Sequence, residues 1–294
     1  MHNNKQRGIL LMILSTFCFA AMSIVVKLSG GRIPLMEQVF VRNAISLVIA
    51  IVLVRKRHVS YFGERRFQPY LFGRSFFGFL GVIALFYASN HAAQADVSIL
   101  SKMSPFVTTL LAFLFLKEKI SKVQIAALIL AFAGAFIVAN PSFNSNVWPL
   151  VVAFLCALCS GVAHTMLSVL GGKADAMTVI LHFSAFSMVA ALPFMIADFV
   201  MPNFGEFILL LLIGLFAAGG QVSLTYAFRM APASEVSIFD YAGIIFSSLL
   251  GYLILGESLT VKSIVGGLLI IVASAMVFFY NRRAVSRKPT RNLK

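Results

Sequence analysis

The sequence predicts an all-α integral membrane protein, with ten transmembrane helices arranged as two inverted five-helix repeats. The composition is the first observation: 60% of the 294 residues are hydrophobic and 12% are charged, with a mean hydropathy of +0.94. Soluble domains average about 25% charged residues. The second observation is a series of apolar runs long enough to cross a bilayer. The third is an alignment of the two halves of the chain with each other.

The apolar runs follow one another with short polar breaks. They cover residues 8–28, 34–54, 71–89, 94–116, 123–139, 148–170, 177–197, 207–228, 234–255 and 261–280. Their lengths are near the roughly 20 residues that a helix needs to cross the hydrocarbon core. Apolar and polar residues do not alternate within them as they do in barrel strands, so we expect helices.

The first run, residues 8–28, also has features of a secretory signal peptide. It follows Lys5 and Arg7 and contains the small pair Ala20-Ala21. However, residues 14–18 align with residues 155–159 at an offset of 141. Cleavage would leave the first half one helix short, so we expect a retained helix, with cleavage as the alternative.

The internal repeat is clearest over residues 84–138, which align with residues 223–277 at a constant offset of 139 without a gap. We therefore predict a first repeat at residues 8–139, a second at residues 148–281 and a basic tail at residues 282–294. Each repeat has an odd number of helices, so the second enters the membrane from the other side. Such inverted repeats are the mechanical basis of alternating access.

The net charge of +14 is unevenly distributed. Of the 24 Lys and Arg residues, 19 lie in the termini and loops of one side, including Arg74 at the start of the third run. Three lie on the other side: Lys27, Arg32 and Lys262. The positive-inside rule predicts both termini in the cytoplasm. The absence of an organelle signal and the short basic tail favour the cytoplasmic membrane of a bacterium. These charges favour anionic lipid headgroups, and no soluble module suggests a nucleic-acid partner.

Few polar residues lie deep within the runs: Arg42, Lys102, His164, His182 and Asp240. A charge inside the bilayer usually faces a cavity or a partner. At the offset of 139, Ser101 aligns with Asp240 and Lys102 aligns with Tyr241. Each half therefore contributes a polar pair at the same symmetric location.

Three interpretations of Lys102 and Asp240 are open. In the first, Lys102 holds a substrate carboxylate and Asp240 holds an ammonium group or a coupling proton, with Tyr241 and Ser101 beside them. In the second, the two form a permanent salt bridge between helices. In the third, Lys102 snorkels to the membrane interface.

The remaining candidates each carry two interpretations. Arg42 either pairs with Glu37 or faces the cavity. His164 and His182 either relay protons or are hydrogen-bonded in the core. Tyr87 and Tyr226 either rim the cavity or pack between helices.

Four carboxylates lie at the ends of the runs, where capping and loop locking are the expected roles: Asp96, Glu118, Glu235 and Glu257.

The sequence argues against an enzyme, a pump and a metal protein. It has no H-E-x-x-H, no G-x-S-x-G and no G-x-x-x-x-G-K-[ST] motif, and its loops leave no room for a separate catalytic domain. Cys18, Cys156 and Cys159 lack metal-ligand spacing. We therefore expect no cofactor or metal, and a membrane-embedded enzyme is the remote alternative.

Several local patterns resemble the drug/metabolite transporter superfamily, in its ten-helix EamA-type branch. They are Pro34 followed by Arg42, Tyr87-Ala88, Ala95-Asp96-Val97-Ser98, Ala231-Pro232-Ala233-Ser234-Glu235-Val236, Leu116-Lys117-Glu118 and Leu255-Gly256-Glu257. Together they cover almost all of residues 8–280. One departure is Arg42, whose mate at an offset of 141 is the uncharged Phe183.

This resemblance implies that runs 94–116 and 234–255 line a central cavity. It also implies a secondary transporter for a small metabolite, with export of amino acids or similar zwitterions as the expected activity. Uptake of a metabolite is the alternative. Protons are a possible coupling partner, and both a monomer and a homodimer are compatible with the sequence.

Overall fold

The computed structural model describes residues 2–104, 106–107, 110, 121–139, 147–170, 173–230 and 237–286. Within these ranges the chain is helical and contains no strand. The elements are α1 (His2–Ser29), α2 (Leu35–Arg57), η1 (Arg65–Phe67), α3 (Gln68–His91), α4 (Gln94–Ser101), α6 (Lys122–Ala139), α7 (Trp148–Leu170), α8 (Ala176–Ala197), α9 (Phe204–Met230), η2 (Ser237–Tyr241), α11 (Ala242–Leu255) and α12 (Val261–Ser286).

Seven of the described helices are long and apolar enough to cross a membrane. Two shorter apolar helices cover residues 122–138 and 239–255. The protein is therefore a multi-pass membrane protein, as the composition predicts. The predicted runs 94–116 and 234–255 extend outside the described residues, so ten spans remain a prediction. The predicted tail is shorter than expected because α12 continues to Ser286, and residues 287–294 lie outside the described part.

Local sequence signals explain where several helices begin and end. Asp175 caps α8, because its carboxylate accepts a hydrogen bond of 2.8 Å from the backbone N–H of Met177. Pro34 immediately precedes α2, and Pro69 lies in the first turn of α3, where a missing N–H costs nothing. Gly256 ends α11 in the left-handed region at φ 67°, which favours glycine.

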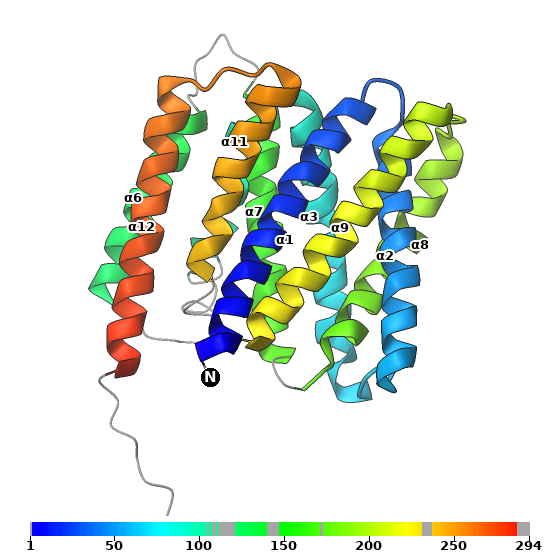
Figure 1. The fold of residues 1–294 in the computed structure, drawn as a ribbon, viewed down its shortest axis with the longest axis horizontal. Helices are drawn as coiled ribbons and strands as arrows, with labels where there is room; N and C mark the ends of the chain where they lie inside the picture. The colour runs from blue at the N-terminus through cyan, green and yellow to red at the C-terminus, as the bar shows by residue number, and fades with distance from the viewer. Residues whose placement is uncertain are drawn as a thin grey trace, which may run out of the picture.

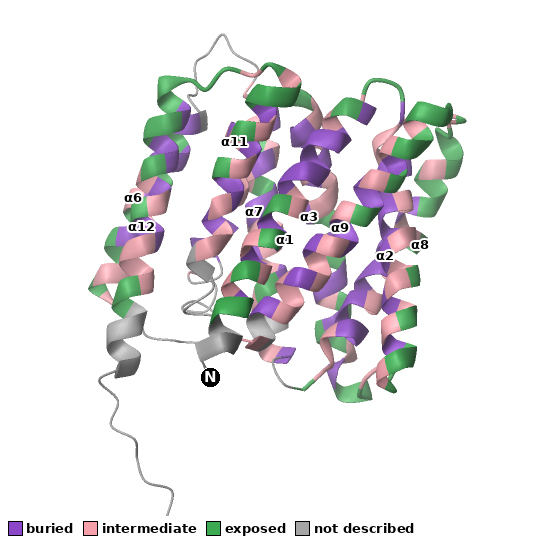
Figure 2. Cartoon of the chain, in the orientation of Figure 1, coloured by how far each residue is buried: buried purple, intermediate pink, exposed green. Residues whose placement is uncertain are grey.

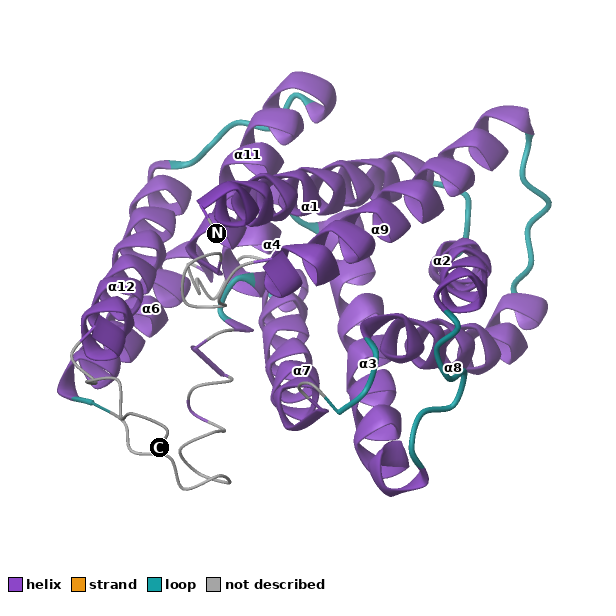
Figure 3. Ribbon diagram, turned by 60° about the horizontal axis from the view of Figure 1, so that its bottom comes forward, coloured by secondary structure: helices purple, strands orange, loops and turns teal. Residues whose placement is uncertain are grey.

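The helices pack in extended pairs: α1 lies along α9, α3 along α7, α2 along α8 and α6 along α12 (Figure 1). Two large apolar cores result among the described residues, with three smaller clusters beside them. One is formed mainly by α4, α6, α7, α11 and α12, and the other by α1, α2, α3, α8 and α9. Figure 3 shows α6, α11 and α12 on one side and α2, α3 and α8 on the other.

Many residues on the outward faces of the helices are exposed (Figure 2), and large apolar side chains are numerous among them. Leu10, Val48, Phe136 and Leu268 are each more than half exposed, at 65%, 61%, 68% and 55%. In water such a surface would aggregate, whereas hydrocarbon solvates it as well as the core does. The exposed face is therefore the lipid-facing one.

Glycines set the closeness of α6 and α12. A methyl group at Gly134 would lie 2.7 Å from the carbonyl oxygen of Gly266 and 3.1 Å from a side-chain carbon of Ile270. A methyl group at Gly266 would lie 2.5 Å from the carbonyl oxygen of Gly134. Small residues allow such close backbone approach between helices in membranes.

We expect Gly266→Ala to force α12 away from α6 and to lower the free energy of unfolding by about 1–3 kcal/mol, the usual cost of overpacking. The measurement is the Tm of the detergent-purified protein. Gly31→Ala is the matched control, because a methyl group at Gly31 would meet no heavy atom within 4 Å. Equal melting temperatures for the two variants would contradict the packing argument.

Candidate functional site

Both halves depart from α-helical geometry at the same symmetric place. In the first half α4 ends at Ser101, and Lys102 and Met103 form a turn. In the second half a 3-10 helix, Ser237–Tyr241, precedes α11. The offset of 139 places residues 98–102 on residues 237–241. Irregular backbone at membrane depth is tolerated where it is buried in protein or lines a cavity, so these two places mark a candidate site.

Lys102 and Asp240 meet at these interruptions. The Lys102 Nζ lies 2.7 Å from Asp240 Oδ1, and the side chains are 17% and 28% exposed. The lysine stem passes Gly243 of α11, where a methyl group would lie 3.2 Å from Lys102 Cε and 3.6 Å from Thr16 Cβ of α1. The pair therefore sits where α1, α4, η2 and α11 come together. Lys102 therefore pairs with Asp240 instead of snorkelling, and a substrate-binding role for the pair stays a prediction.

His164 belongs to the same polar region. It lies on α7, its side chain is exposed, and it is within electrostatic reach of Lys102, Asp240 and Arg74. Its role as a proton relay remains a prediction.

Arg42 is buried and lies away from Glu37. Its Nη1 donates a hydrogen bond of 3.1 Å to Asn43 Oδ1, and its guanidinium lies over the Phe183 ring at 5.7 Å from the centroid. Glu37 instead accepts a hydrogen bond of 3.2 Å from the backbone N–H of Val200. In the part of the chain described, no ion pair joins Arg42 to Glu37. The interpretation that Arg42 pairs with Glu37 is therefore wrong.

Arg74 is the residue that the sequence reasoning missed. We expected it among the loop charges, because the third apolar run begins at residue 71. In the structure α3 begins at Gln68, so Arg74 is buried within the helix, and its guanidinium lies 4.3 Å from the centroid of the Phe183 ring. The sequence feature that could have indicated the buried position of Arg74 is Gly78, one turn later on α3. A methyl group there would lie 2.6 Å from Arg74 Nη1 and 3.0 Å from Phe183 Cε2.

The two companions predicted for the ion pair face elsewhere. The Ser101 hydroxyl donates a hydrogen bond of 2.9 Å to the carbonyl oxygen of Ser98 in its own helix. Tyr241 is 7% exposed and lies in the apolar core formed with α6 and α12, where its phenol group interacts with Ser274. Any contact of these two side chains with a substrate stays a prediction.

Tyr87 and Tyr226 lie near opposite ends of the bundle, because α3 and α9 run in opposite directions (Figure 1). Tyr87 stacks on His91 at 4.3 Å between ring centroids. The Arg57 guanidinium lies over the Tyr226 ring at 4.8 Å. The structure therefore does not bring these two tyrosines to the ion pair.

His182 lies near the start of α8, where its Nε2 is 3.2 Å from the carbonyl oxygen of Phe62. The Phe62 and His182 rings also meet edge to face, with centroids 6.4 Å apart. Both contacts join α8 to the segment between α2 and α3.

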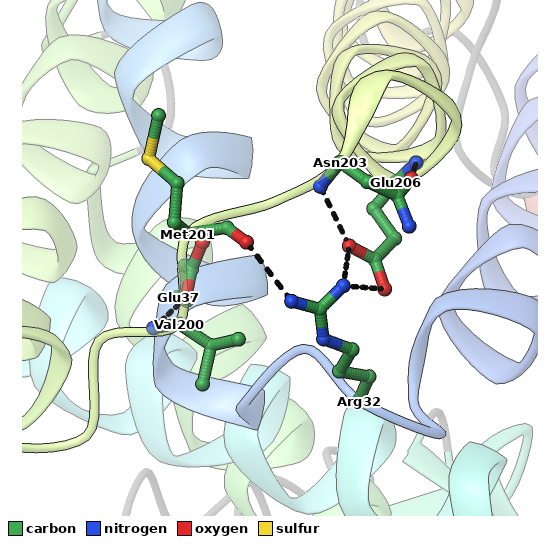
Figure 4. A network of polar contacts seen from close by, with 6 residues as sticks. All are labelled: Arg32, Glu37, Val200, Met201, Asn203 and Glu206. Carbon is green, nitrogen blue, oxygen red and sulfur yellow. Dashed lines mark hydrogen bonds and ion pairs between the residues drawn. The ribbon is translucent and has the colours of Figure 1, made fainter.

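Ion pairs and hydrogen bonds lock the loops at the upper face in Figure 1. Arg32 Nη1 lies 3.1 Å from Glu206 Oε2, and Arg32 Nη2 donates to the carbonyl oxygen of Met201 at 3.5 Å (Figure 4). Asn203 and Glu206 also exchange two hydrogen bonds, each from a backbone N–H to a side chain, of 2.7 and 2.9 Å. These contacts join the α1–α2 loop to the α8–α9 loop.

Glu257 forms a second lock on that face. It pairs with Lys27 and accepts a hydrogen bond of 2.7 Å from the backbone N–H of Gln94, the first residue of α4. Glu257 thus caps the start of α4 and joins it to α1, as expected. Asp96 accepts a hydrogen bond from the Ser263 hydroxyl, whereas Glu118 and Glu235 lie outside the described residues.

We expect Glu257→Gln to lower the Tm by several degrees, because the amide keeps the shape but loses the charge that Lys27 faces in a partly buried site. Glu64→Gln is the matched control. Glu64 pairs with Arg66 at the surface, where the side chains are 56% and 71% exposed, and such pairs contribute little. A comparable loss of stability in both variants would argue against the lock.

Besides the ion pair, the described residues form a pocket but no metal-binding cluster. A small apolar hollow between α2, α8 and α9 is lined by Ala50, Leu53, Ile180 and Val222, among others, and lies away from the ion pair. Among the described side chains, no group of three His, Cys, Asp or Glu residues is placed to hold a metal ion.

Comparison with known proteins identifies the same protein family twice along the chain. The EamA-like transporter family matches residues 6–140 and again residues 147–279. A pseudopaline exporter of Pseudomonas aeruginosa is 35% identical over 268 residues, covering 90% of this chain and 94% of the relative.

More distant relatives include an S-adenosylmethionine uptake transporter of Rickettsia bellii, 24% identical over 96% of each chain. Solute carrier family 35 member G1 of Mus musculus is 25% identical over 82% of this chain and 69% of the relative. A solved crystal structure superposes with a TM-score of 0.66 at 16% identity, covering 94% of this chain and 98% of the other, which shows a shared fold.

Proposed function

The chain belongs to the EamA-like transporter family of the drug/metabolite transporter superfamily, and we propose that it exports a small organic metabolite by alternating access. The expected substrate class is an amino acid or a similar zwitterion. The observation that carries the proposal is the Lys102–Asp240 pair at the symmetric interruption of two helices. The carboxylate of a zwitterion can take the place of Asp240 beside Lys102, and its ammonium group can take the place of Lys102 beside Asp240.

The direction of transport is supported by the relatives. The exporter of Pseudomonas aeruginosa is 35% identical, whereas the uptake transporter of Rickettsia bellii is 24% identical. Uptake is therefore the second candidate function.

An inverted repeat of residues 8–139 and 148–281 is supported by the helix pairs. Exchanging the halves turns the pair α1–α9 into α7–α3, and α1–η2 into α7–α4, and all four pairs are in contact. The pairs α2–α8 and α6–α12 each map onto themselves. The two matches of the family along the chain support the same division.

In the proposed cycle, Lys102 takes the substrate carboxylate and Asp240 takes the ammonium group or a proton. One ion pair is then replaced by two, so little electrostatic energy is lost when the pair opens. The locks Lys27–Glu257 and Arg32–Glu206 hold the upper face of Figure 1 together and must separate for that face to open. The positive-inside rule supports both termini in the cytoplasm, which makes this face the outer one.

Counterflow in proteoliposomes tests the proposal. Liposomes with the purified protein are loaded with a mixed pool of unlabelled metabolites, and mass spectrometry measures which isotope-labelled compounds enter. We expect selective entry of one chemical class, recovered without a change in mass. Entry equal to that of protein-free liposomes would contradict transport, and a labelled compound recovered with a changed mass would instead favour a membrane-embedded enzyme.

A further inference from the structure

We propose that Arg42 and Arg74 form an oxyanion site for a carboxylate of the transported metabolite, so that the substrate carries a net negative charge and is not a simple zwitterion. The proposal names the substrate class of the transporter and rests on the proposed function. It also makes a claim about binding that is tested without transport.

Both arginines are buried without enough hydrogen-bond acceptors. Their relative exposures are 5% for Arg42 and 8% for Arg74. Arg42 Nε, Arg74 Nε and Arg74 Nη1 are buried and have no hydrogen-bond partner. A buried polar group without a partner costs about 1–3 kcal/mol, and more when it is charged. Such a cost is retained where a ligand supplies the missing acceptor.

No described carboxylate supplies that acceptor. The described acidic side chains contact other groups, namely Glu37 with Val200, Glu64 with Arg66, Asp96 with Ser263, Asp175 with Met177, Glu206 with Arg32, Asp240 with Lys102 and Glu257 with Lys27. The described residue that remains, Asp198, is exposed at the end of α8. Within the described chain, the two arginines are thus left without an anionic partner.

Phe183 holds the two guanidinium groups on one aromatic ring. Arg74 lies 4.3 Å and Arg42 5.7 Å from its centroid, and Phe183 itself is 4% exposed. The ring attracts each cation, but the two cations also repel each other. An oxyanion between them removes that repulsion. The planar fork of donors on each guanidinium fits a carboxylate in two-point contact.

The charge balance of the region favours an anionic substrate. Arg42 and Arg74 on the Phe183 ring and Lys102 beside Asp240 contribute three basic side chains, whereas Asp240 contributes one carboxylate. His164 is within electrostatic reach of both Arg74 and the ion pair, and Arg74 shares the Phe183 ring with Arg42, so these groups belong to one polar region. A zwitterion adds no net charge, so the excess positive charge of this region stays uncompensated. An amino acid with additional carboxylates offsets that positive charge.

The test measures the Tm of the detergent-purified protein with malonate, succinate and glutarate at constant ionic strength. We expect at least one dicarboxylate to raise the Tm in a concentration-dependent way, as a ligand of the folded state does. The corresponding diamides should have no effect. Stabilisation no greater than that by chloride would overturn the proposal, and stabilisation by inorganic phosphate alone would overturn the assignment to a carboxylate.

Variants separate a binding role from a structural one. Arg74→Met removes an unpaired buried charge, so we expect a Tm without dicarboxylate that is equal to or above that of the parent, together with at least a tenfold loss of sensitivity to dicarboxylate. Arg74→Lys keeps the positive charge but not the planar fork of donors, so we expect its sensitivity to dicarboxylate to fall several-fold. Arg66→Gln is the control, because Arg66 is 71% exposed at its side chain and should respond as the parent does. Unfolding of Arg74→Met, or an unchanged response in Arg74→Lys, would overturn the proposal.

Counterflow distinguishes this inference from the proposed function. Binding of dicarboxylates that depends on Arg74, without counterflow of any compound, would support the site and contradict transport. Counterflow of neutral zwitterions at an unchanged rate in Arg74→Met would support transport and contradict the site.

Discussion

Asp240→Asn is expected to reduce counterflow by at least 100-fold while the protein still folds. The amide cannot hold a proton or attract an ammonium group, and it leaves Lys102 with a neutral neighbour. Removing one member of a buried ion pair costs about 3–5 kcal/mol. Because both side chains keep some exposure, we expect a smaller loss of about 1–3 kcal/mol in the free energy of unfolding.

The double variant Lys102→Met, Asp240→Leu decides between transport and a structural bridge. If the pair takes part in transport, the double variant regains stability and remains inactive. If the pair only joins α4 to the second half, the double variant regains both stability and counterflow, because an apolar pair replaces a buried ion pair without loss. Gel filtration and Tm give the stability, and proteoliposomes give the rate.

Gly78→Ala is expected to lower counterflow by at least tenfold with a much smaller effect on the Tm. The added methyl group would lie 2.6 Å from Arg74 Nη1 and 3.0 Å from the Phe183 ring, so the guanidinium must move. Gly78 is a positioning residue in this argument, since it acts through Arg74. The Tm response to dicarboxylate should weaken in parallel, which a purely structural defect would not produce.

Gly73→Ala is the matched control on the same helix. A methyl group at Gly73 would lie 3.7 Å from the Met166 sulfur, an ordinary van der Waals contact. Both substitutions exchange glycine for a better helix former, so their intrinsic effect on α3 is the same. Equal transport by the two variants would contradict the role assigned to Gly78.

Much of this protein was predictable from its sequence. The apolar runs predicted the long helices, because a chain in lipid must satisfy its backbone polar groups within helices. Depth within the runs and the offset of 139 singled out Lys102 and Asp240, which lie 2.7 Å apart in the structure. The family was recognisable from short motifs, and the family matches confirm it. Substrate, direction and coupling were not encoded in any motif.

The tertiary structure decided what each helix presents to its neighbours. It buried Arg74, separated Arg42 from Glu37, and turned Tyr241 into the apolar core. The physical reason is that lipid and protein core are equally apolar, so hydrophobicity determines which segments are helices but not which face of a helix points inward. Those faces follow from side-chain packing between segments far apart in the sequence, and only the folded structure shows that packing.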